Sequence, residues 1–114
     1  MEQPLKTQTL DQLRETFRAI EEARDDIHLS EKQKFYLETV SVQLRNTERS
    51  IIKKKEQELV SVLTTDSKEL KEMAKQLKAS AEKLEKVTKA VEKVSKLVEL
   101  LIKGVATGLS SGIL

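Results

Sequence analysis

The side chains that could carry out catalysis or bind a metal ion are few in this sequence of 114 residues. His28 is the only histidine and cysteine is absent, so the usual Cys/His zinc site has too few ligands. His28 falls in a predicted turn beside Asp25 and Asp26, where a solvated histidine is the simplest interpretation. The carboxylates of Glu21 and Glu22 belong to a charged helix face without a predicted pocket. We therefore predict no catalytic residue, no metal site and no cofactor, and we expect that the protein is not an enzyme.

The three glycines form a second pattern that could be functional. Gly104, Gly108 and Gly112 stand four residues apart in KGVATGLSSGIL (residues 103–114), after a long stretch without glycine. They do not resemble a phosphate-binding loop, which precedes a capped helix. If the helix continues, the glycines share one ridge, a pattern that lets helices approach closely in lipid. Next to this ridge, the face for tail packing or membrane contact carries Val105, Leu109 and Ile113.

Two interpretations of this tail remain open. In the first, Gly104 ends the last helix as its C-terminal cap and the rest trails away. In the second, residues 97–114 insert into a membrane, because only Glu99 and Lys103 are charged there. A full span normally needs about 20 apolar residues, so this segment suits insertion into one leaflet. Three glycines also cost a helix in water ~2–3 kcal/mol relative to alanine, so lipid, a partner or the protein's own surface must compensate.

A basic ridge of Arg45, Arg49 and Lys53 raises a third possibility, nucleic-acid binding. The three residues are spaced by four, so they follow one side of a helix and suit contacts with phosphates. Glu48 and Glu56 interrupt the ridge, and no aromatic side chain is interleaved for base stacking. A solvated, partly paired helix face is therefore favoured over a nucleic-acid site.

The composition predicts an all-α fold. Charged residues make up 35% of the chain and aromatic residues 3%, which is typical of long helices and coiled coils with an aliphatic core. Neither glycine nor proline interrupts residues 5–103, and no segment alternates apolar and polar residues as a strand does. The absence of cysteine fits a reducing compartment, and no secretory signal is visible. We expect a cytoplasmic protein, associated with membrane if the tail inserts.

Three helices are predicted, at about 9–28, 31–64 and 66–103. Thr9 with Gln12, and Ser30 with Gln33, form capping-box patterns at the first two starts. Residues 64–67 (TTDS) are poor helix formers, so we place a turn near residue 65 with Asp66 as the cap of the third helix. The alternative is one helix over 31–103, ~110 Å long. The favoured fold is a helical bundle, with a short N-terminal helix packed on a long antiparallel hairpin of coiled-coil character. Residues 1–103 form a single domain, and 104–114 form the apolar tail.

The strongest periodic signal is a seam in the third helix. Apolar residues recur at alternating spacings of three and four, with Ser80 as the only polar member. We call these residues the aliphatic seam and predict that they contact a partner: Leu70, Met73, Leu77, Leu84, Val87, Val91, Val94, Val98 and Leu101.

These patterns give three functional hypotheses. The leading one is a non-enzymatic interaction or assembly module, which binds a protein partner or a second copy through the aliphatic seam and the apolar tail. A homo-oligomer is the expected form. The alternative is a small membrane-active or membrane-anchored helical protein, pore-forming or toxin-like, that inserts residues 97–114. The third is a weak nucleic-acid binder acting through the basic ridge, and it is the least favoured.

Overall fold

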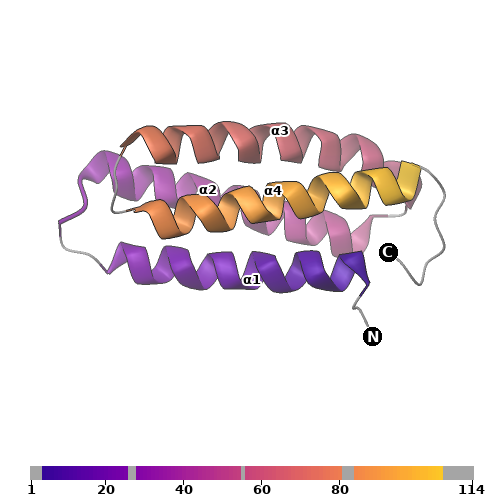
Figure 1. Ribbon diagram of the computed structural model, residues 1–114, viewed down its shortest axis with the longest axis horizontal. Helices are drawn as coiled ribbons and strands as arrows, with labels where there is room; N and C mark the ends of the chain where they lie inside the picture. The colour runs from indigo at the N-terminus through magenta and orange to yellow at the C-terminus, as the bar shows by residue number, and fades with distance from the viewer. Residues whose placement is uncertain (1–3, 26–27, 55, 81–83, 107–114) are drawn as a thin grey trace.

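The protein folds into an all-α bundle of four helices. The computed structural model describes residues 4–25, 28–54, 56–80 and 84–106. Within them lie α1 (Leu5–Arg24), α2 (Glu31–Lys53), α3 (Glu56–Ser80) and α4 (Glu85–Ala106), and no strand. Consecutive helices run in opposite directions, and both α1 and α3 pack against α2 and α4 (Figure 1). The predicted fold class is confirmed. The longest dimension is 47 Å, which excludes the ~110 Å rod.

The predicted helix boundaries are wrong in the middle of the chain. α2 ends at Lys53, where Lys54 takes an extended backbone with ψ near 143°, and α3 begins at Glu56. The supposed turn at residues 64–67 lies inside α3. Its poor helix formers are accommodated because the hydroxyl of Thr64 donates back to the carbonyl of Val60, at 2.5 Å. Asp66 does not cap a helix; its carboxylate accepts a hydrogen bond from the side chain of Gln43 in α2.

The second break separates α3 from α4, inside the segment that we predicted as one helix over 66–103. α3 ends at Ser80 and α4 begins at Glu85. Ser80, the one polar member of the spacing pattern, is therefore the last residue of a helix. Leu84 still has only 1% of its surface exposed, so the chain reverses direction while the seam stays in the core. The three-helix count fails because the regular spacing continues through the reversal.

One predicted helix start is correct and one is wrong. Ser30 caps α2 with the expected capping box: its hydroxyl accepts from the Gln33 N–H at 3.1 Å, and the Gln33 side chain accepts from the Ser30 N–H at 2.8 Å. α1 instead begins at Leu5, directly after Pro4, four residues before the predicted cap. Thr9 is a helix-interior residue whose hydroxyl donates to the Leu5 carbonyl at 2.6 Å.

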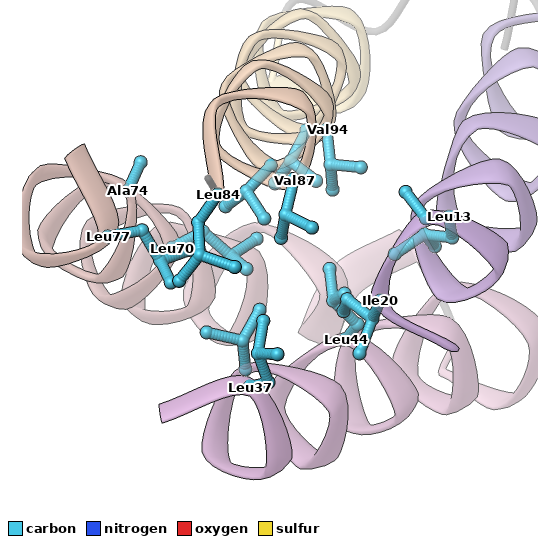
Figure 2. Packing of buried hydrophobic residues seen from close by; sticks show 14 of the residues in the cluster. Leu13, Ile20, Leu37, Leu44, Leu70, Ala74, Leu77, Leu84, Val87 and Val94 are labelled. Carbon is cyan, nitrogen blue, oxygen red and sulfur yellow. The ribbon is translucent and has the colours of Figure 1, made fainter. Parts of the chain in front are cut away.

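The core is aliphatic and lies between the four helices. Leu13 and Ile20 come from α1, and Leu37 and Leu44 from α2; their side chains point toward those of α3 and α4 (Figure 2). Each is at most 1% exposed. Burying a leucine or isoleucine side chain stabilises a fold by about 1.5–3 kcal/mol relative to exposing it. Because the chain has few aromatic rings, these branched side chains supply most of the stabilisation.

The continuity of α3 through residue 65 can be tested with proline. Thr65 is exposed, so Thr65→Pro acts on the backbone: it removes one helical hydrogen bond and clashes with the preceding turn. We expect a loss of ~3 kcal/mol or more relative to Thr65→Ala, measured by urea unfolding. If residue 65 were in a turn, the two variants would be equally stable, and that outcome would contradict the helix boundaries.

Candidate functional site

The aliphatic seam lies inside the bundle. Eight of its nine members are at most 1% exposed, and Met73 is partly buried against the same core. The seam therefore contacts the chain's own α1 and α2. A partner could reach it only if the bundle opened. While the bundle stays folded, only the exposed side chains on the outside of the helices can contact a partner.

The first glycine of the tail is part of α4. Gly104 is buried, and the helix continues past it to Ala106. Interpreting Gly104 as the residue that ends the helix is therefore wrong. Val105 is partly buried against the core. The remaining tail residues that we singled out, Gly108, Leu109, Gly112 and Ile113, lie outside the described residues.

The segment predicted to insert into a membrane begins in the core. Val98 and Leu101 are fully buried. Removing them from the bundle would expose the apolar side chains of α1 and α3 that they cover. Among the described helices, none combines the length and the apolar character that crossing a bilayer requires.

The basic ridge is divided by the fold. Arg45 and Arg49 line a hollow of about 340 Å³ between α1 and α2, which Arg24 also lines, whereas Lys53 lies outside it. Glu21 and Glu48 line the same hollow, and the Glu48 carboxylate lies 3.8 Å from the Nε of Arg14. Carboxylates therefore offset most of the positive charge, an arrangement that does not favour a run of phosphates.

The other candidates for chemistry remain dispersed. His28 is exposed in the connection between α1 and α2. Across the described ranges, His, Cys, Asp and Glu side chains nowhere gather in a group of three that could hold a metal ion.

A buried polar cluster that we did not predict joins α2 to α3. The carboxylate of Asp66 accepts hydrogen bonds from the Gln43 Nε2 at 3.1 Å and from the Thr47 hydroxyl at 3.2 Å. Thr47 is fully buried, and Asp66 and Gln43 are each 8% exposed. A sequence signal existed, since Asp66 interrupts the apolar spacing of α3 and Gln43 and Thr47 are one turn apart on α2.

The cluster fixes how α2 and α3 align. Sliding one helix by a turn would leave the Asp66 carboxylate buried without donors, which costs more than the hydrogen bonds contribute. Burial raises the pKa of Asp66 above its ordinary value of 3.8, and the two hydrogen bonds partly oppose that effect. No cation pairs with Asp66 among the residues that the structure describes. The arrangement suits a structural role, because nothing near the carboxylate could act as a substrate site.

The raised pKa predicts how stability depends on pH. The stabilising contribution of protonated Asp66 is fully present below pH 3.8 and is lost as the pH rises through the folded-state value. Asp66→Asn removes the charge, while its amide can accept from Gln43 and donate to Thr47. We expect this variant to be more stable than the wild type at pH 7, and the gain to vanish near pH 3.5. Urea unfolding across this range measures it.

Asp11→Asn, at an exposed position in α1, controls for the loss of one carboxylate anywhere on the chain. If Asp66→Asn is less stable than the wild type at pH 7, and by at least as much as at pH 3.5, the ionised carboxylate does not carry a desolvation cost.

Comparison with known proteins gives no match to this chain. Family models, curated proteins and solved structures were all searched, and none of them matches the sequence or the fold at a significant level. A four-helix bundle supports many unrelated functions, so the fold class alone assigns none. A functional proposal therefore rests on the surfaces and the charges of this chain.

Proposed function

We propose that the protein is a non-enzymatic helical assembly module whose partner is a second copy, docked through the outer face of α2. The observation that carries the proposal is the exposure of large apolar side chains on this helix. Phe35 is 67% exposed, Val42 is 52% exposed and Ile52 is 60% exposed. Of the strongly exposed large apolar residues that the structure describes, only Leu100, on α4, lies elsewhere.

These side chains form a surface suited to pairing with another helix. Phe35 and Val42 are seven residues apart, which is two turns, so they lie on the same face. Arg49 is two further turns along on this face, and Ile52, at the same end of α2, lies about 80° around the helix from Val42. We call Phe35, Val42 and Arg49 the α2 face, with Ile52 at its edge. A surface that combines an exposed aromatic ring, aliphatic side chains and arginine has the composition of a protein interface.

The sequence of the α2 face is complementary to itself when two copies run antiparallel. A two-fold axis at Val42 brings Val42 against Val42 of the second copy. Phe35 and Arg49 lie seven residues on either side of Val42, so each ring meets a guanidinium, a favourable cation–π pair. Glu31 and Lys53 lie eleven residues on either side, so opposite charges meet at both ends. This symmetry favours a closed dimer over an open chain of copies.

The expected association is weak and reversible. Pairing one helix with another buries an area at the low end for protein interfaces, below about 1,200 Å². We therefore expect a dissociation constant of about 10–100 µM. The helix pair would have coiled-coil character, but its contacts would come from α2 and not from the aliphatic seam, which stays in the core.

This mode of assembly needs neither a membrane nor nucleic acid. Insertion of residues 97–114 would require Val98 and Leu101 to leave the core. Nucleic-acid binding would require Arg45 and Arg49 to act beside the carboxylates of Glu21 and Glu48. The ridge of Gly104, Gly108 and Gly112, a glycine zipper that we predicted from the sequence, also plays no part in this dimer. Self-association uses side chains that already point outward on the folded chain.

A charge placed on the two-fold axis tests the proposal. Val42→Glu sets two carboxylates against each other in the dimer, so it should abolish dimerisation while leaving the exposed helix folded. Leu100→Glu is the matched control, since it makes the same kind of change at an exposed apolar residue of α4. Sedimentation equilibrium over about 5–500 µM should show a dimer for the wild type and Leu100→Glu and a monomer for Val42→Glu.

Circular dichroism should show the same helix content in all three proteins. The proposal fails if the wild type stays monomeric over the whole concentration range. It also fails if Leu100→Glu disrupts the dimer as much as Val42→Glu, because association would then not depend on α2.

A further inference from the structure

A hollow rich in lysine lies between α3 and α4, away from the α2 face. Its volume is about 310 Å³, which is at the small end for ligand pockets. The small residues Ala74 and Ser95 line it where the helices approach each other. The remaining lining is charged, with Glu92 as its only acid and with four lysines: Lys71, Lys75, Lys78 and Lys96.

The charges across this interface are complementary except at one point. Lys71 forms an ion pair with Glu99, which fixes the antiparallel alignment of α3 and α4. In this alignment Lys78 stands opposite Glu92, so the two ends of the hollow match opposite charges. Between them, Lys75 of α3 and Lys96 of α4 both line the hollow. Like charges on facing helices destabilise the contact, unless an anion lies between them.

Within the described part of the chain, neither Lys75 nor Lys96 forms an ion pair, since no acidic side chain lies within 4 Å of either. Glu92 nevertheless lines the hollow one turn before Lys96 on α4. The equivalent contact between α1 and α4 is different, because there Lys86 binds Glu22 at 3.0 Å. The hollow between α1 and α4 is lined by Arg18, Lys86, Lys89 and Lys93 against Glu15 and Glu22, so its excess of positive charge is smaller than that of the hollow between α3 and α4.

Ser95 gives an independent indication that this hollow takes a ligand. Its side chain is 2% exposed, and its hydroxyl has no hydrogen-bond partner. Thr88, the buried hydroxyl two turns earlier on α4, instead donates to the Leu84 carbonyl at 2.9 Å. A buried hydroxyl without a partner is uncommon, because losing its hydrogen bonds to water costs free energy. An acceptor in the hollow reaches the Ser95 hydroxyl after its side chain rotates, because the oxygen itself has almost no accessible surface.

We propose that this hollow binds a phosphate group between Lys75 and Lys96. A phosphate dianion supplies the charge that the two ammonium groups lack and an oxygen that can accept from the Ser95 hydroxyl after a rotation about its side-chain bond. Lys71 and Lys78 border the same position. The Glu92 carboxylate repels an anion, so the phosphate lies on the side of the hollow away from it. The phosphate comes from a small soluble compound or from a lipid headgroup, which share this chemistry.

The test is a titration of isotope-labelled protein with inorganic phosphate, followed by NMR at an ionic strength held constant with sodium chloride. We expect saturable shifts at the amides of Ala74 and Ser95. Lys75→Glu should weaken binding at least tenfold, since it pairs with Lys96 and repels the anion. Ser95→Ala should weaken it several-fold. The control Lys32→Glu, an exposed residue of α2, makes the same charge change outside the hollow and should bind as the wild type does.

Flotation with vesicles of phosphatidylcholine, with or without phosphatidylinositol 4-phosphate, distinguishes the two sources. Binding to inorganic phosphate supports a soluble ligand, and binding only to the phosphoinositide vesicles, lost in Lys75→Glu, supports a headgroup. In buffer without phosphate, Lys75→Glu should melt at a higher temperature than the wild type, which shows that the variant folds. The proposal is overturned if neither probe binds, or if Lys32→Glu and Lys75→Glu weaken binding equally.

Discussion

The structure depends on burying one long series of aliphatic side chains within a single chain. The seam from Leu70 to Leu101 is too long and too apolar to face water, and only 3% of the residues are aromatic, so aliphatic side chains must supply most of its cover. The chain reverses between α3 and α4, which folds the seam onto itself, and α1 and α2 cover the remaining sides (Figure 2). Because the seam is occupied in this way, surfaces for a partner are left to side chains that the core does not use.

Two of the polar groups that are buried within this aliphatic arrangement differ in how they are satisfied. Asp66 is buried but has two donors from α2, so it sets the alignment of neighbouring helices at the cost of a desolvated carboxylate. Ser95 is buried without a partner in a hollow that four lysines line. The first feature is satisfied inside the chain and needs nothing further. The second is incomplete, and an incomplete polar group next to uncompensated charge points to a ligand.

Sequence reasoning could reach the fold class, the start of α2 and the apolar spacing of the seam, because each depends on local signals, but it assigned the seam to a partner and not to the core of the chain. The Ser30–Gln33 capping box and the apolar spacing are read directly from neighbouring residues. The helix ends near Lys53 and Ser80 could not be read in this way. Neither carries glycine or proline, and the apolar spacing passes through the second without a shift. These ends follow from the bundle, in which four helices of 20, 23, 25 and 22 residues match in length around one core. The Asp66 cluster and the lysine hollow are each formed by residues from two helices. The spacing of residues within a single helix therefore does not reveal them.

The central claim is that the seam folds back within one chain, and a distance between α3 and α4 tests it most directly. Because the chain has no cysteine, spin labels can be placed at the exposed positions Glu72 and Leu100 through Glu72→Cys and Leu100→Cys. Double electron–electron resonance, with excess unlabelled protein to suppress signals between copies, then reports the distance within one chain. In the bundle the labels lie on adjacent antiparallel helices whose axes are about 8–10 Å apart, so we predict a distance below about 30 Å. One continuous helix over 66–103 would separate them by about 42 Å, and a peak at that distance would contradict the account.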